Sequence, residues 1–145
     1  MGLVDFVLSA GDKLFGKAES DQERSAKLEN RVRKMGLPVE MLKIDVSKDT
    51  ATIQGTVESQ ATREKIVLTV GNTDGISKID DRMTVKKKEP EAQYYTVVKG
   101  DTLSKIAKQY YGDAMKYPTI FDANKPMLTD PDKIYPGQVL RIPPQ

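Results

Sequence analysis

The chain has 145 residues and contains neither cysteine nor histidine, which excludes disulfides, thiolate metal sites and catalysis by a nucleophile paired with histidine. Its 23 basic and 21 acidic side chains give a formal net charge of +2, so it lacks the basic excess that drives nucleic-acid binding. The length suits one ordinary domain or two very small ones, and its 38% hydrophobic and 30% charged residues are typical of a soluble globular protein. We therefore expect neither an enzyme nor a nucleic-acid-binding protein.

The first segment, residues 1–18, has apolar residues at positions 3, 4, 7, 8, 14 and 15. This spacing predicts a short amphipathic helix, which we expect to dock on the module that follows. The segment does not resemble a secretory signal, because Asp5 interrupts it and no positively charged region precedes it. Its first twelve residues contain no Lys or Arg, so we expect no stable membrane insertion, and the predicted location is the cytoplasm.

Residues 19–86 form the first predicted module. A charged, strongly helix-forming stretch over residues 20–34 is followed by Gly36 and Pro38, which are typical of a helix end. Two runs then alternate between apolar and polar residues, at positions 42–46 and 51–57. With the short turn between them they predict a β-hairpin.

A second helix is expected to begin after Ser59, which can cap it, and to run to Gly71, with Arg63 and Glu64 on its exposed face. The apolar residues between positions 76 and 85 predict a last strand. The order helix, strand, strand, helix, strand predicts an α+β module with two helices on one face of a small sheet.

Two motifs in this module carry a family resemblance. Residues 53–57 (Ile-Gln-Gly-Thr-Val), the helix after them, and residues 70–76 (Val-Gly-Asn-Thr-Asp-Gly-Ile) resemble a BON domain. The following residues 87–93 are polar and contain Pro90, so we interpret them as a solvated linker.

Residues 94–145 form the second predicted module. Residues 95–99 alternate as a strand does, and the chain then turns at Gly100 into a helix that Asp101 or Thr102 can cap. A second helix contains Pro118 in its first turn. A tight turn at positions 136–137 leads into a final strand. The residues expected to form the core are Ile106, Ile120, Phe121, Ile134, Leu140 and Ile142.

This second module resembles a LysM domain, on the motif at residues 94–107, on Asn124 and on the closing run at residues 132–143. The resemblance implies the order strand, helix, helix, strand, with the strands antiparallel and both helices on one face. It also implies a groove for N-acetyl sugars of glycans such as peptidoglycan. The residues that would line this groove are Gly100, Asp101, Thr102, Leu103, Ile134, Pro136 and Gly137.

Taken end to end, the chain resembles a family of small bacterial potassium-binding proteins that carry both modules. The resemblance rests on residues 1–11, 70–76, 123–128 and 132–143. It implies a cytoplasmic protein that binds K⁺, accepts Rb⁺ and Cs⁺, binds Na⁺ more weakly, and acts as an ion sensor by changing its conformation or domain packing. No segment points to a particular protein partner.

Potassium is large and weakly hydrated, and proteins hold it with several backbone carbonyls that replace its water shell. Segments with glycine can turn carbonyls inward without a side-chain clash, and residues 7–12 and 71–76 are two such segments. Given the resemblance, the hypothesis is that one K⁺ ion is bound by backbone carbonyls of both segments. The candidate ligands are Val7, Ala10, Asp12, Gly71, Thr73 and Ile76.

Three alternatives remain at this point. The glycines of the two segments can simply end helices. The LysM-like module can bind peptidoglycan, which would require export. The BON-like module can serve as a lipid or envelope adaptor, although the balanced charge does not favour it.

Overall fold

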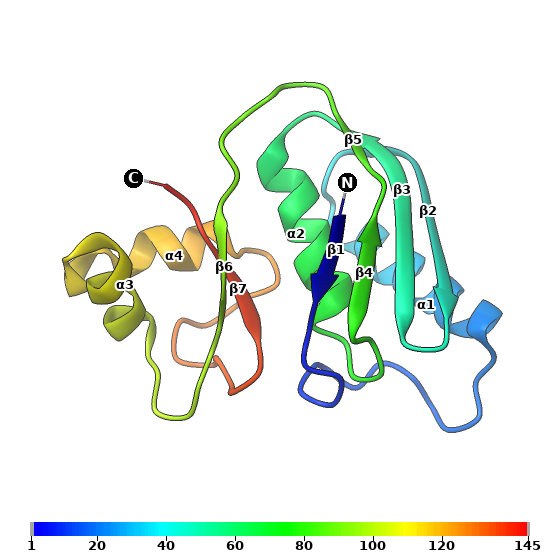
Figure 1. Cartoon of the computed structure of the whole chain (residues 1–145), viewed down its shortest axis with the longest axis horizontal. Coiled ribbons are helices and arrows are strands. Elements are labelled where there is room, and N and C mark those ends of the chain that lie inside the picture. The colour runs from blue at the N-terminus through cyan, green and yellow to red at the C-terminus, as the bar shows by residue number, and fades with distance from the viewer. Residues whose placement is uncertain (1, 145) are drawn as a thin grey trace.

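The computed structural model describes residues 2–144, which form two modules joined by a short connection (Figure 1). The elements of the N-terminal module are β1 (Gly2–Asp5), α1 (Asp21–Lys34), β2 (Val39–Ser47), β3 (Thr50–Val57), α2 (Gln60–Gly71), β4 (Lys78–Asp81) and β5 (Thr84–Val85). Those of the C-terminal module are β6 (Gln93–Thr96), α3 (Leu103–Tyr111), the 3₁₀ turn η1 (Ala114–Lys116), α4 (Tyr117–Ala123) and β7 (Val139–Ile142).

The N-terminal module is one sheet covered by two helices. Its strands lie in the order β1-β4-β3-β2, and β5 adds a short parallel pairing to β3. Strands β2 and β3 form the expected hairpin, whereas β4 runs parallel to β3. In Figure 1, α1 lies behind the sheet, and α2 lies at the β1 edge on the side of the C-terminal module, with its lower end behind β1. The predicted order of elements is confirmed, except that the last strand is split at Asp81, whose carboxylate accepts a hydrogen bond from the Met83 amide at 3.0 Å.

The helix predicted for residues 1–18 is wrong, because this segment begins as strand β1. β1 pairs antiparallel with β4, with Val4 opposite Ile79. The apolar positions that suggested a helix do not share one buried face, since Leu3, Val7 and Leu8 are exposed. The free edge of β4 is a tertiary partner that local spacing does not reveal, and tertiary context overrides local propensity.

The helix starts follow the expected capping chemistry. The Ser20 hydroxyl accepts from the Glu23 amide while the Glu23 carboxylate accepts from the Ser20 amide, both at 3.1 Å. Ser59 caps α2, and Thr102, the second of the two expected candidates, caps α3. These bonds satisfy amides that a helix start otherwise leaves without a partner.

In the C-terminal module, β6 and β7 are antiparallel, and the order strand, helix, helix, strand is confirmed. β7 is buried along its whole length because it faces both modules. Leu140 and Ile142 enter the core of the C-terminal module, whereas Val139 belongs to the core of the N-terminal module. Strand β7 of the C-terminal module thus also contributes a residue, Val139, to the core of the N-terminal module.

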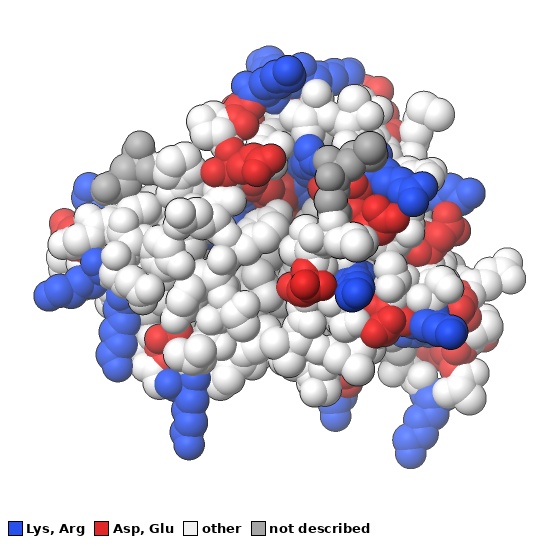
Figure 2. Space-filling view, viewed as in Figure 1, with Lys and Arg blue, Asp and Glu red and all other residues white. Residues whose placement is uncertain are grey.

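On the face drawn in Figure 2, acidic and basic side chains are interspersed over the N-terminal module, whereas the C-terminal module is largely uncharged apart from side chains, mostly basic, near its rim. Within residues 2–144, no helix combines the length and the apolar character that crossing a membrane requires.

Candidate functional site: a carbonyl-lined loop between two modules

The N-terminal segment and the loop after α2 lie side by side. Residues 6–12 and 71–77 are joined by backbone hydrogen bonds in both directions, and Asp12 forms a parallel bridge with Thr73. These bonds run from Phe6 N to Ser77 O at 2.8 Å, and from Asp12 N to Asn72 O, Asp74 N to Asp12 O and Gly75 N to Leu8 O, each at 2.9 Å. Two segments more than fifty positions apart therefore form one loop cluster.

All six candidate ligands of the ion lie in these two segments. Within residues 2–144, the backbone oxygens of Ala10, Gly71 and Ile76 accept no hydrogen bond. The other three candidates each accept one and keep a second lone pair, as a carbonyl oxygen has two. Their donors are Ala10 N for Val7, Asp74 N for Asp12 and Ile76 N for Thr73. The cluster thus offers backbone oxygens with unused acceptor capacity.

Gly11 is required by the close approach of the two segments. A Cβ at this position would overlap the Asn72 carbonyl group and the Thr73 amide nitrogen. No helix ends at Gly11, so for this residue the alternative that it only ends a helix is wrong. Gly71 does end α2, yet the Phe6 ring also lies directly against it. At both positions the glycine lets a neighbouring group lie against the backbone.

The C-terminal module contacts the same cluster. Gly137 lies against Ala10, and a Cβ on Gly137 would overlap the Ala10 Cβ. Burial, together with the nearby Asp12 carboxylate, raises the pKa of the Tyr135 phenol to about 12. Because it lies against Ala10, Gly137, a candidate glycan residue, is part of the contact between the two modules.

Asn72 joins the loop to β7 through its side chain. Its Nδ2 donates to Val139 O and its Oδ1 accepts from Val139 N, both at 2.8 Å. The side-chain amide of Asn72 therefore pairs with the backbone of Val139 as a residue of a neighbouring strand would. Asn124 makes the same pair with Arg141 from within the C-terminal module, at 2.9 and 2.8 Å.

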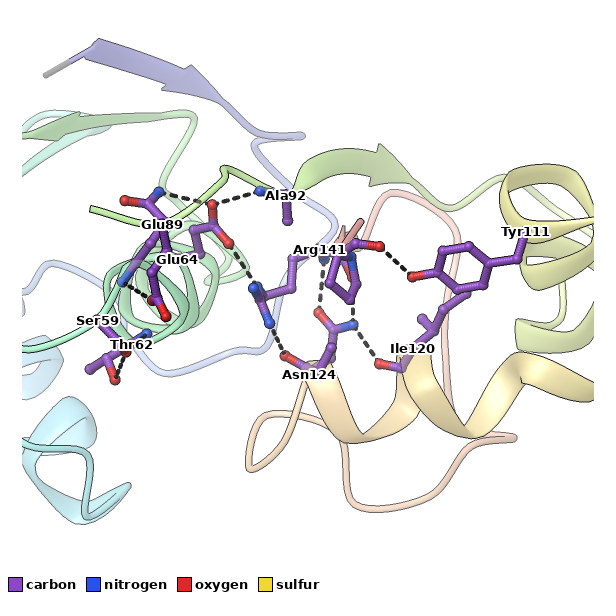
Figure 3. A network of polar contacts seen from close by, with 12 residues as sticks. Ser59, Thr62, Glu64, Glu89, Ala92, Tyr111, Ile120, Asn124 and Arg141 are labelled. Carbon is purple, nitrogen blue, oxygen red and sulfur yellow. Dashed lines mark hydrogen bonds and ion pairs between the residues drawn. The ribbon is translucent and has the colours of Figure 1, made fainter. Parts of the chain in front are cut away.

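A buried ion pair lies next to these contacts (Figure 3). Arg141 Nε donates to Glu64 Oε1 at 2.8 Å, and the two side chains are 9% and 3% exposed. Glu64 Oε2 accepts from Gln60 Nε2 at 2.9 Å and from the Ala92 amide at 3.0 Å, and Arg141 Nη1 donates to Ala123 O at 3.1 Å. The prediction that Glu64 is exposed is wrong.

The prediction for Arg63 is also wrong. Arg63 was also placed on the exposed face, yet its Nε donates to Asp81 at 2.6 Å and its side chain is only 17% exposed. The expected linker is exposed over residues 87–91, and one of its side chains also contacts the N-terminal module. The Glu89 carboxylate accepts from the Gln60 amide at 3.0 Å, at the start of α2.

A separate groove lies in the C-terminal module. It is a cavity of about 220 Å³ lined by Thr102, Leu103, Ser104, Tyr117, Pro131 and Asp132.

Of the seven candidate glycan residues, only Thr102 and Leu103 line this groove. Asp101 instead accepts from the Tyr95 hydroxyl at 2.5 Å, a bond that raises the pKa of Tyr95 to about 12. Ile134 packs on the core of its module, and Gly100 O accepts from Lys105 Nζ at 3.1 Å. Pro136 is exposed beside Gly137.

Family models match both modules. The BON domain model matches residues 20–87, and the LysM domain model matches residues 95–143. The α+β fold with one BON and one LysM domain is thereby confirmed. Both are families of binding domains.

One relative matches along the whole chain. The potassium binding protein Kbp of Escherichia coli O6:H1 is 46% identical over 148 residues, which covers 99% of each chain. Other relatives match only in part. An uncharacterized protein of Deinococcus radiodurans is 57% identical over 34% of this chain and 19% of its own length. An esterase of Mycobacterium tuberculosis is 51% identical over 37% of this chain and only 11% of its own length.

Proposed function

We propose that this chain, which belongs to the family of the Escherichia coli potassium binding protein Kbp, binds one K⁺ ion between its N-terminal segment and the loop after α2. The proposed ligands are the backbone oxygens of the six candidates given by the sequence. Side-chain identity at these positions would then matter little for ligation.

The observation that carries this proposal is the set of free carbonyls. The oxygens of Ala10, Gly71 and Ile76 accept no hydrogen bond within residues 2–144, and they come from two segments that hydrogen bonds hold together. Ca²⁺ and Mg²⁺ prefer formal carboxylate charge, whereas K⁺ is held by carbonyl dipoles. The same described residues contain no group of three or more acidic, Cys or His side chains placed to hold a metal. The donor set is therefore the one that fits K⁺.

We further propose that the protein acts in the cytoplasm as a K⁺ sensor. K⁺ is the abundant monovalent cation there, and the proposed site lies where the two modules meet. Val7 and Ala10 contact Gly137 of the LysM domain. A ligand shifts an equilibrium by its differential affinity for two states, so an ion held at this contact would favour one packing of the modules.

Potassium is expected to stabilise the folded protein more than sodium does. Binding to the folded form alone adds about 2.7 kcal/mol at a hundredfold excess over the dissociation constant. Calorimetric titration of KCl into potassium-free protein should show one site, with RbCl and CsCl active and NaCl weaker. The amide resonance of Val139, which donates to Asn72, should shift during the same titration. Equal heats and equal stabilisation from all four salts would refute the proposal.

A second candidate function is glycan binding by the LysM domain. The groove of about 220 Å³ at Thr102, Leu103 and Tyr117 favours it, because it lies away from the contacts with the BON domain. The polar side chains that line the groove, which include Ser104 and Asp132, can form hydrogen bonds with the hydroxyl and N-acetyl groups of a sugar.

Chitin oligomers are the probe for this second function. If the groove binds N-acetyl sugars, chitotetraose should shift the amide resonances of residues 102–104 and 132, and Asp132→Ala, which changes an exposed side chain of the groove, should reduce these shifts. Potassium binding should be unaffected by this substitution, since the two sites share no residue. An unchanged spectrum at millimolar chitotetraose would remove glycan binding.

A further inference from the structure

Asn72 contacts each of the three parts that meet at the proposed ion site. It is the first residue after α2, and its carbonyl accepts from the Asp12 amide at 2.9 Å. Its side chain holds Val139 of β7 through two hydrogen bonds of 2.8 Å. Asn72 is 4% exposed, so water does not replace these partners at low cost.

The backbone conformation of Asn72 sets the direction of the neighbouring carbonyls. At φ −81° and ψ 41° it leaves the helical region, and the chain turns away from the axis of α2. In a continuing helix Gly75 N would bond to Gly71 O. Here Gly75 N donates to Leu8 O instead, and Gly71 O has no hydrogen-bond donor within the described residues.

The side-chain pair fixes that conformation from the other module. Val139 is 3% exposed, and losing the Asn72 amide would leave its buried N–H and C=O without these partners. Buried backbone polar groups without partners are rare because they are costly. The docked β7 therefore favours the turn at Asn72 that directs Gly71 O and Thr73 O.

We propose that Asn72 is a positioning residue through which the LysM domain holds the ion loop in its binding conformation. This inference rests on the proposed potassium function. It makes K⁺ affinity depend on a side chain that supplies no ligand to the ion. Because coupling between two equilibria is reciprocal, K⁺ would strengthen the docking of β7 by the same factor.

The test compares Asn72→Ala with Asn124→Ala. Each removes an amide that pairs with the backbone of β7, but only Asn72 lies in the ion loop. We expect Asn72→Ala to raise the K⁺ dissociation constant about tenfold, a difference of about 1.4 kcal/mol, and to remove the K⁺-dependent shift of the Val139 amide. For Asn124→Ala we expect a K⁺ dissociation constant within about twofold of wild type and a K⁺-dependent shift of the Val139 amide like that of wild type. This substitution destabilises the LysM domain.

Calorimetry is run at a temperature where circular dichroism shows every variant folded. Should Asn124→Ala unfold, Tyr111→Phe replaces it, because it removes the 2.6 Å bond to Pro143 O inside the same domain. If wild type binds K⁺ and Asn72→Ala binds it equally tightly, the positioning role is wrong while the proposed function stands. If wild type itself does not bind K⁺, the proposed function fails.

Discussion

Gly11→Ala is expected to raise the dissociation constant for K⁺ by about 30-fold or more. The added Cβ would overlap the Asn72 carbonyl and the Thr73 amide, so the N-terminal segment must move away from the loop. Overpacking of this kind costs about 1–3 kcal/mol, and 2 kcal/mol corresponds to roughly a 30-fold change in affinity. Calorimetric titration of KCl into the potassium-free variant measures the effect.

Gly16→Ala is the matched control, because it places the same methyl group in the same segment. The nearest atom to its Cβ would be Glu19 Oε1 at 3.3 Å, the far end of a flexible side chain. We expect its K⁺ affinity to match wild type. Wild-type affinity in Gly11→Ala would show that the two segments need not approach each other for binding.

The local chemistry of the sequence predicts much of the fold. Ser59 caps its helix as expected, and one of the two candidates for the next cap, Thr102, does so as well. The hairpin of β2 and β3 and the tight turn before β7 also follow from neighbouring residues. Such signals act within a few positions of one another, which is why one sequence is enough to recognise them.

Contacts between distant segments explain the errors. β1 is a strand because β4, more than seventy positions away, offers it a free edge. Glu64 is buried because Arg141 reaches it from the other module. Periodicity alone places a charged residue such as Glu64 on the exposed face of its helix. No residue near Glu64 in the sequence indicates that Arg141 is its partner.

The candidate ion site was partly accessible from sequence. The family resemblance, together with the glycines of residues 7–12 and 71–76, pointed to these two segments, and the structure brings them together. Asn72 lies inside the second segment, yet its role depends on β7, 67 positions later. An asparagine just after a helix is also a common cap, so its side-chain partner could not be inferred. For a similar reason the sequence does not reveal that Gly137, one of the candidate glycan residues, contacts the N-terminal segment.

Arg141→Met should destabilise the protein by about 3 kcal/mol or more, because it leaves the Glu64 carboxylate buried without its cation. Glu64 is 3% exposed and would keep only the two neutral donors Gln60 Nε2 and Ala92 N. Urea unfolding in potassium-free buffer measures the loss. Arg82→Met is the control, since the Arg82 side chain is 56% exposed in its pair with Asp80, and exposed pairs contribute only about 0–1 kcal/mol.

The double variant Glu64→Gln with Arg141→Met separates the charge from the packing. With the carboxylate neutralised, no uncompensated charge remains, and the side-chain amide oxygen that replaces it can still accept from the Ala92 amide. We therefore expect the double variant to be more stable than Arg141→Met by about 1 kcal/mol or more. Glu64→Gln alone should also destabilise, because the Arg141 guanidinium, held at 9% exposure, loses its anion. Additive effects of the two substitutions would mean that the two charges do not interact.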